Sequence, residues 1–242
     1  MTLARLVTAF YIECAASDVG HKMESHKVPE TTTEFGLPID RSFGTPATAD
    51  ALQRAAKALR AHNHSVEIAN TVADARTYVS SILPKDQMIF TASSETVRLS
   101  GLDDEINKSG NYRSIRQQMA KLDPKTQMSE MKRLGATPDV VVGSVHAVTE
   151  EGQLVVGSAT GSQLGPYATG AGKAIFVVGA QKVVPDLEAA IRRLRFYSYP
   201  LEDIRARKAY GNPSTLAKIL IINSEFPPGR STVVLIREPI GF

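Results

Sequence analysis

Residues 139–186 contain three short apolar runs separated by two polar segments that carry glycine. The runs at 140–142, 154–156 and 175–178 are rich in β-branched residues, and the third run ends at Gly179. Continuous apolar runs of this length are typical of strands that are buried on both faces. This stretch therefore predicts three strands of an α/β sheet, with the polar segments at the strand ends.

The polar segment at 157–172 carries five glycines among sixteen residues, together with serine, threonine and glutamine. It is too polar to be packed in a core. Loops at the strand ends of α/β proteins are where these proteins commonly bind ligands. We therefore expect residues 157–172 to contact a ligand.

The preceding part of the chain alternates between helical and strand patterns. Amphipathic helices are predicted at 49–62 and 72–83, and strands at 65–69 and 88–91. This alternation with short joints predicts a parallel sheet covered by helices. A long, mostly helical region is expected after residue 91, up to about residue 135.

The C-terminal part continues with two helices and two strands. Helices are predicted at 186–196 and 200–210, the second beginning with proline and followed by Gly211. Strands at 219–222 and 232–236 flank a Pro-Pro-Gly turn. We expect these two strands to pair as an antiparallel hairpin at the edge of the sheet.

Residues 1–46 differ in composition from the rest. Residues 17–46 are polar and rich in proline and glycine, which predicts an extension that is peripheral or poorly ordered, and a compact domain over 47–242. Residues 6–16 are apolar, but a single preceding Arg5 and an interrupting Glu13 fit a secretion signal poorly. A peripheral helix or an unstructured extension is the favoured interpretation.

Composition excludes several classes of protein. The net charge of +3 comes without a Lys/Arg-dense run interleaved with aromatic residues, so no nucleic-acid partner is expected. No run approaches the roughly 20 apolar residues of a membrane span. Cys14 is the only cysteine, which excludes an internal disulfide and a cysteine-based zinc or iron–sulfur site and favours a cytoplasmic location.

Two glycine motifs are rejected on their spacing. A P-loop needs GxxxxGK followed by serine or threonine, whereas here Tyr167 stands at the first glycine and Ala174 follows the lysine. A dinucleotide-binding GxGxxG opens a helix, whereas here a strand follows. No metal is assigned either, because only His62 and His64 have a suitable spacing and no carboxylates can be placed beside them.

The loop offers candidate substrate-binding residues. Backbone N–H groups and hydroxyls in a glycine-containing turn can bind a phosphate or carboxylate. The alternative is a surface loop with solvated hydroxyls. The loop's length and its position after a buried strand favour ligand contact by Ser158, Thr160, Gly161, Ser162 and Gln163.

Three more candidates lie at the ends of the predicted strands. His146 and Glu150 are the candidate catalytic pair, as acid/base and as nucleophile or base, although a structural histidine and a solvated glutamate are the plain alternatives. Lys182 follows the third strand, where a cation can hold an anionic substrate. An ordinary exposed lysine is the alternative there.

In this order, these segments resemble the LUD domain, a family named for lactate utilisation. The resemblance rests on the acidic-glycine turn at 149–152 and on the G-x-x-K-[IV]-V-P segment at 179–185. The tracts at 206–211, 218–223 and 237–242 also resemble stand-alone members. The resemblance covers about residues 48–242.

The resemblance implies a Rossmann-like three-layer α/β sandwich with a mainly parallel sheet and an antiparallel edge, similar to the ribose-phosphate isomerase and CoA-transferase group. It also implies a role in the use of lactate or another small carboxylate, as an accessory or substrate-binding subunit. The alternative is a stand-alone protein that binds an anion, a sugar phosphate or a nucleotide, or an isomerase-like enzyme without a redox role. Whether the isolated chain is an enzyme stays open.

The resemblance also implies the partners. We expect a small anionic ligand and no cofactor held by this chain itself. Iron–sulfur clusters would come only through partner subunits, and self-association is a further option. One departure concerns the loop: many members carry Ser-Leu-Leu-Pro-Pro ahead of the third strand, whereas this chain has Gln-Leu-Gly-Pro-Tyr-Ala at 163–168.

Overall fold

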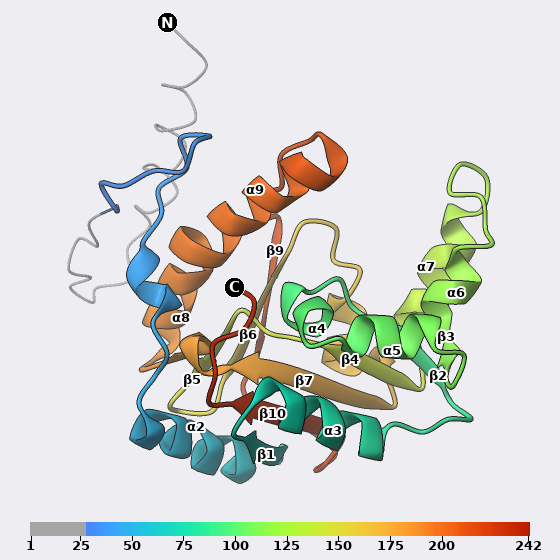
Figure 1. Ribbon diagram of the computed structural model, residues 1–242, viewed down its shortest axis with the longest axis horizontal. Coiled ribbons are helices and arrows are strands. Elements are labelled where there is room, and N and C mark those ends of the chain that lie inside the picture. Colours follow the sequence, from blue (N-terminus) through green and yellow to red (C-terminus); the bar gives the residue numbers. More distant parts are fainter. Residues whose placement is uncertain (1–27) are drawn as a thin grey trace, which may run out of the picture.

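The computed structural model describes residues 28–242, and its centre is a sheet of six parallel strands. The strand order is β1-β10-β7-β4-β2-β3 (Figure 1). The strands are β1 (Ser65–Ala69), β10 (Ser231–Ile236), β7 (Lys173–Gly179), β4 (Val140–Gly143), β2 (Met88–Thr91) and β3 (Arg113–Ser114). The predicted parallel sheet and the predicted strands at 140–142 and 175–178 are confirmed.

A second, smaller sheet has mixed pairing and the order β8-β5-β6-β9. Its β5–β6 and β6–β9 pairs are antiparallel, and its β5–β8 pair is parallel. The strands are β8 (Val183–Val184), β5 (Ala147–Thr149), β6 (Leu154–Ser158) and β9 (Lys218–Ile222). The run at 154–156 is therefore a buried strand as predicted, but in this second sheet.

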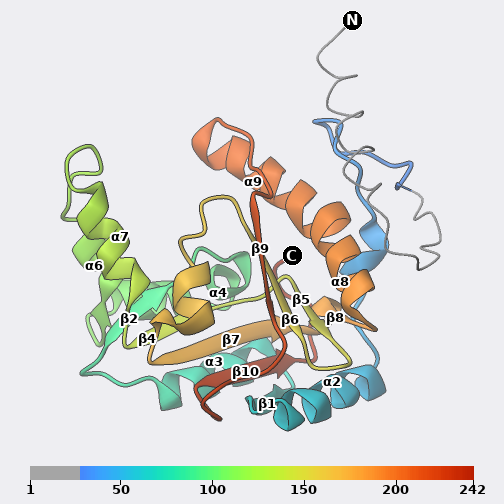
Figure 2. The same ribbon diagram turned by 180° about the vertical axis from the view of Figure 1, so that it is seen from behind.

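Helices cover both faces of the main sheet, seen from opposite sides in Figures 1 and 2. One apolar core joins one face to three helices: α3 (Val72–Ile82), α4 (Glu95–Leu99) and α5 (Leu102–Lys108). The other core joins the opposite face to the second sheet and three helices: α2 (Ala49–Ala61), α6 (Ile115–Met119) and α7 (Met128–Ala136). The result is a three-layer α/β sandwich.

The outer face of the second sheet is covered by α8 (Leu187–Arg193) through a third, smaller apolar core. A π-helical turn, Leu194–Ser198, continues α8 into α9 (Tyr199–Tyr210). The predicted pair of helices in this region is therefore confirmed, with a continuous connection between them.

The predicted antiparallel hairpin of the last two strands is wrong. Strand β10 lies between β1 and β7 in the main sheet, whereas β9 is an edge strand of the second sheet. The burial of the strands gives the reason. Val233, Val234 and Leu235 in β10 are fully buried, which suits a central strand, whereas Ile219 and Ile221 in β9 are more than one-third exposed.

The helix starts follow local sequence rules. Thr48 caps α2 through a hydrogen bond from the N–H of Ala51, and its five buried residues form one apolar stripe. Thr71 and Asp74 form a reciprocal capping box at the start of α3. These short-range signals explain why sequence patterns placed the first two helices correctly.

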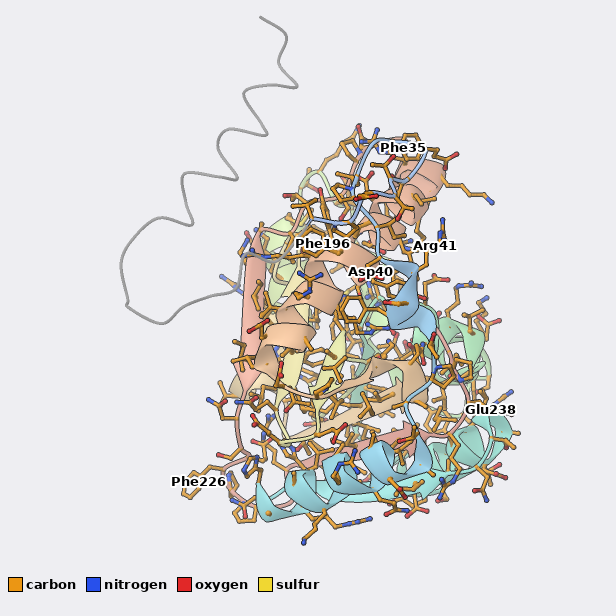
Figure 3. The ribbon with its side chains drawn as sticks, turned by 90° about the vertical axis from the view of Figure 1, so that its left-hand side faces the viewer. Phe35, Asp40, Arg41, Phe196, Phe226 and Glu238 are labelled. Atoms are coloured by element: carbon orange, nitrogen blue, oxygen red, sulfur yellow. The ribbon has the colours of Figure 1, made fainter. Side chains whose placement is uncertain are left out.

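The described part of the N-terminal extension packs against the α8–α9 region. Ile39 is fully buried, and the N–H of Asp40 donates to the carbonyl oxygen of Phe196 at 2.7 Å (Figure 3). The expectations for residues 6–16 and for Cys14 lie outside the described residues. Within 28–242, no helix combines the length and the apolar character that crossing a bilayer requires.

Candidate functional site

A cavity of about 760 Å³ opens at the carboxyl ends of the parallel strands. Its floor comes from the residues that follow β2, β4 and β7, and one wall comes from the loop after β6. Helices α4, α5 and α6 line one side, and α9 with the segment after it lines the other (Figure 1). Ligands of open α/β sheets bind in this position, and the volume is in the usual range for ligand sites.

Lys182 lies at the floor of the cavity and is only 2% exposed. Its Nζ donates to Thr96 Oγ1 at 2.8 Å, to Ser144 Oγ at 3.0 Å and to the carbonyl oxygen of Val145 at 3.1 Å. Three acceptors match the three protons of an ammonium group. Burial, and then Arg193 nearby, lowers the pKa of Lys182 well below its usual value.

The two hydroxyls around Lys182 are oriented by other bonds. Ser144 Oγ donates to the carbonyl oxygen of Val177 at 2.6 Å, and Thr96 Oγ1 donates to that of Ile240 at 3.2 Å. Each hydroxyl proton is thus already used, and only lone pairs face Nζ. The network therefore fits a charged Lys182.

Ser144 is held in place by a close packing of Tyr167 against β4. The N–H of Ser144 donates to Tyr167 Oη at 3.2 Å. A Cβ atom at Gly143 would come within 1.7 Å of that Oη, so a glycine is required there. Tyr167 belongs to the π-helical turn Pro166–Gly170, inside the segment where the loop departs from the family pattern.

Arg193 is a second buried cation close to Lys182, and its side chain is fully buried. Its Nε donates to the carbonyl oxygen of Gln181 at 3.0 Å, and its Nη1 donates to the carbonyl oxygen of His146 and to Ser198 Oγ. Nη2 is buried without a hydrogen-bond partner. Burial lowers the pKa of Arg193 to about 10, so it stays charged at neutral pH.

Neither of these cations pairs with a side-chain carboxylate in the described part of the chain. Among residues 28–242, no side-chain carboxylate forms an ion pair with Lys182 or Arg193. Buried charges are normally paired, because removing a charge from water costs several kcal/mol. Lys182 therefore leaves an unpaired positive charge at the floor of the cavity, with Arg193 as a second buried charge nearby.

His146 presents a hydrogen-bond donor to this cavity. Its Nδ1 accepts from the N–H of Gly157 at 3.1 Å, which places the proton of the neutral ring on Nε2. Burial, Lys182 and Arg193 lower the pKa of His146 to about 3. At neutral pH the ring is thus uncharged, and it suits donation to an anion or carbonyl oxygen rather than proton abstraction.

Arg116 adds a third cation from the α6 side. Its Nε donates to the carbonyl oxygen of Thr91 at 2.8 Å, its Nη2 donates to Ser93 Oγ at 3.1 Å, and its guanidinium lies over the Phe90 ring. It forms no ion pair with a side-chain carboxylate in the described chain. Burial lowers its pKa.

The acidic residues of the cavity are already engaged at the rim. Glu95 pairs with Arg98, and Glu202 pairs with Arg205, both at 2.7 Å. Asp103 Oδ1 accepts from Asn107 Nδ2 at 2.9 Å. These groups do not neutralise the cations of the floor.

The predicted binding loop lies in the wall of the cavity. Ser158, Thr160, Ser162 and Gln163 line it, and Gly161 makes the turn with a φ of +85°. However, the N–H of Gly161 donates to Ser158 Oγ at 2.9 Å and that of Ser162 to Thr160 Oγ1 at 3.3 Å. These amides are therefore bonded inside the loop, which leaves ligand contact to its side chains.

The structure does not bring Glu150 to this site. Glu150 follows the far end of β5, about 13 Å along the strand from His146, and its carboxylate pairs with Arg54 at 2.5 Å. It is not among the residues that line the cavity. His146 and Glu150 thus lie at opposite ends of the same strand.

His62 and His64, the two histidines with a metal-like spacing, contact different groups. His64 Nδ1 lies 2.5 Å from Ser231 Oγ, and His62 Nδ1 lies 3.3 Å from the carbonyl oxygen of Gly152. Over residues 28–242, no three His, Cys, Asp or Glu side chains converge as metal ligands.

The sequence model of the LUD domain matches residues 52–236, which is most of the chain. The chain belongs to the LUD-domain family. Among solved structures, it is similar to a DUF162 family protein from Deinococcus radiodurans, with 11% identity and a TM-score of 0.47, over 79% of this chain and 99% of that one. No curated protein matches the sequence.

The sequence pointed to some of the residues that line this cavity and not to others. Lys182 and the 157–163 loop were found because they follow strands. Arg116, which lines the cavity, and the buried Arg193 near Lys182 were missed, because arginines in helical segments normally face solvent. Ser144 and the glycine before it stood at a strand end, and that position was the signal that would have found them.

Proposed function

We propose that this LUD-domain protein binds an organic anion in the cavity at the carboxyl ends of its parallel strands. The observation that carries the proposal is the buried Lys182 on the cavity floor, which has no carboxylate partner in the described chain and has a second unpaired cation, Arg193, nearby. An anionic group on the ligand would supply the missing counter-charge. His146 Nε2–H and Arg116 would donate hydrogen bonds to it.

The family's association with lactate utilisation in general supports a place in the metabolism of small carboxylates. We propose that the chain acts there as an accessory or substrate-binding subunit, beside partners that carry iron–sulfur clusters. The lowered pKa of His146 and the remote position of Glu150 support binding rather than proton transfer by this pair. The isolated chain is accordingly expected not to oxidise L-lactate with an artificial electron acceptor, and turnover would contradict the accessory role.

The binding test uses calorimetry with L-lactate, pyruvate, ribose 5-phosphate, AMP and inorganic phosphate. At least one organic anion is expected to bind the wild-type protein, and Lys182→Met is expected to abolish that binding. Lys57→Met, which removes an exposed lysine from α2, is the matched control. If Lys182→Met binds like the control, the cavity floor is not the anion site.

A second variant covers the case in which Lys182→Met folds poorly. Arg116 is only partly buried, so Arg116→Gln is expected to fold normally and to weaken anion binding. Arg133→Gln, which changes an exposed arginine of α7, is its control. Equal affinity of these two variants would exclude Arg116 from the site.

A stand-alone binder of sugar phosphates or nucleotides, without a redox role, is the second candidate. The volume of about 760 Å³ favours it, because a three-carbon acid such as lactate would fill only a small part of the cavity. Both candidates share the same anion-binding floor, and the panel above separates them by which ligand binds most tightly.

A further inference from the structure

The cavity has a second half that the anion-binding floor does not use. This part of the wall is formed by α9, by the segment that follows α9 and by Phe242. It is lined by apolar and aromatic side chains: Leu194, Tyr199, Tyr210, Pro213, Leu216 and Phe242. The cationic floor thus adjoins a part of the wall that carries several apolar and aromatic side chains.

The two halves meet directly at Gly157. Its N–H donates to His146 Nδ1, while a Cβ atom there would lie 2.6 Å from Leu216 Cδ1 and 2.7 Å from Leu194 Cδ1. Leu194 and Leu216 of the apolar wall thus contact the same glycine that donates a hydrogen bond to His146. A ligand whose anionic group rests on the floor would place the group attached to it against this wall.

The far end of the wall carries an exposed aromatic ring. Tyr210 is 66% exposed, and the guanidinium of Arg205 lies 5.3 Å from the centre of its ring. Packing within the chain does not require a tyrosine so exposed. Aromatic rings and arginine planes of this kind stack on flat heterocycles, including nucleobases.

Hydrogen-bonding groups stand beside the aromatic wall. Asn212, Ser214 and Thr215 line the cavity directly after α9, and Asp103 and Asn107 line the facing side. Asp103, Asn107 and Asn212 already bond within the chain. A ribose or the edge of a base would bond to the hydroxyls of Ser214 and Thr215, which an apolar or acyl tail would not use. The volume of about 760 Å³ also accommodates such a ligand.

From this arrangement we propose that the ligand is a nucleoside phosphate. Its phosphate lies on the floor with Lys182 and His146, and its base lies against the wall of Tyr199 and Tyr210. The proposal rests on the proposed anion-binding function and gives the chemical class of the ligand.

The test compares the affinities of AMP, ribose 5-phosphate, inorganic phosphate and L-lactate by calorimetry. AMP is expected to bind at least tenfold more tightly than ribose 5-phosphate, because only AMP carries a base. Tyr210→Ala is expected to weaken AMP binding about five- to tenfold, as loss of a stacking partner does, and to leave ribose 5-phosphate binding unchanged.

The matched control is Phe226→Ala, which removes an aromatic ring that is 88% exposed, away from α9 (Figure 3). It is expected to leave the affinity of every probe unchanged. Because Tyr210 and Phe226 are both exposed, both variants are expected to fold like the wild-type protein.

The outcomes separate this inference from the proposed function. If L-lactate, phosphate or ribose 5-phosphate binds as tightly as AMP and binding depends on Lys182, the anion site stands and the nucleoside inference is overturned. Equal AMP affinity of Tyr210→Ala and Phe226→Ala would overturn it too. If no probe binds, or if binding survives Lys182→Met, the proposed function fails and the inference fails with it.

Discussion

Buried charges at the two ends of the parallel strands are treated in opposite ways. At the amino ends, Arg230 precedes β10 and forms two bonds with the buried Glu225, Nε to Oε1 at 2.9 Å and Nη2 to Oε2 at 3.0 Å. At the carboxyl ends, Lys182 and Arg193 are buried without an ion pair to any side-chain carboxylate of the described chain.

The paired end serves the structure. Arg230 also donates to the carbonyl oxygens of Tyr167 and Ala171, so it closes the end of the π-helical turn that holds Tyr167 against Ser144. At the unpaired end, Lys182 and Arg193 also bond to carbonyl and hydroxyl oxygens, but no carboxylate of the described chain offsets the cost of burying their charges. The two ends thus differ in whether a carboxylate of the described chain neutralises the buried charge, and the proposed anion site lies at the end where none does.

The largest effect is expected for Glu225→Gln. This substitution keeps the shape of the side chain but leaves Arg230 without a counter-ion. Arg230 then becomes a buried cation without a carboxylate partner, as Lys182 is. The free energy of unfolding is expected to fall by about 3–5 kcal/mol, measured by urea denaturation. Glu151→Gln, at an exposed position, is the control, and equal stability of the two variants would show that the pair contributes little.

The next effect concerns pH and His64, which lies beside the paired end. Burial lowers the pKa of His64 from 6.5 to about 4. Between these pH values the unfolded chain takes up a proton on His64 that the folded protein does not bind. The contribution of His64 to the free energy of unfolding is therefore fully present above pH 6.5 and is lost as the pH falls toward 4. The slope from this group reaches about 1.4 kcal/mol per pH unit.

The measurement is urea unfolding of the wild-type protein and His64→Gln at pH 7, 6 and 5. The variant is expected to lose less stability than the wild type on acidification. His146 contributes in the same direction, but it is present in both proteins and cancels in the comparison. Identical slopes would mean that His64 has the same pKa in the folded and unfolded states.

A smaller effect on stability is expected for Lys182→Met at the unpaired end. Removing the unpaired buried charge removes its desolvation cost and so stabilises the folded state, while the loss of three hydrogen bonds destabilises it. The free energy of unfolding is expected to change by no more than about 1 kcal/mol, since apolar replacement of buried charges is often neutral. A loss as large as that of Glu225→Gln would show that Lys182 is structural and would abolish the contrast.

The smallest effect is expected for Glu150→Gln. The Arg54–Glu150 pair lies on the surface, where ion pairs contribute little, and far from the cavity. Anion affinity and unfolding free energy are both expected to match those of the wild-type protein. Weakened binding would restore Glu150 to the site and would contradict the separation from His146 that the structure describes.

Much of the fold was predictable because its causes are local. The β-branched runs at 140–142 and 175–178 can be buried only inside a sheet, and capping residues such as Thr48 and Thr71 mark helix starts. The pairing of β9 and β10 was not predictable in the same way. Both strands look alike in the sequence, and their neighbours are chosen by segments more than fifty residues away.

The sequence by itself determined a parallel α/β sheet, the LUD-domain likeness and a lysine with a polar loop at the strand ends. Only the tertiary structure decided which charges are buried and which are paired. Arg192 and Arg193 are adjacent in one helix, yet only Arg193 is fully buried. Burial and charge pairing are properties of the space around a side chain, and that space is assembled from distant parts of the chain.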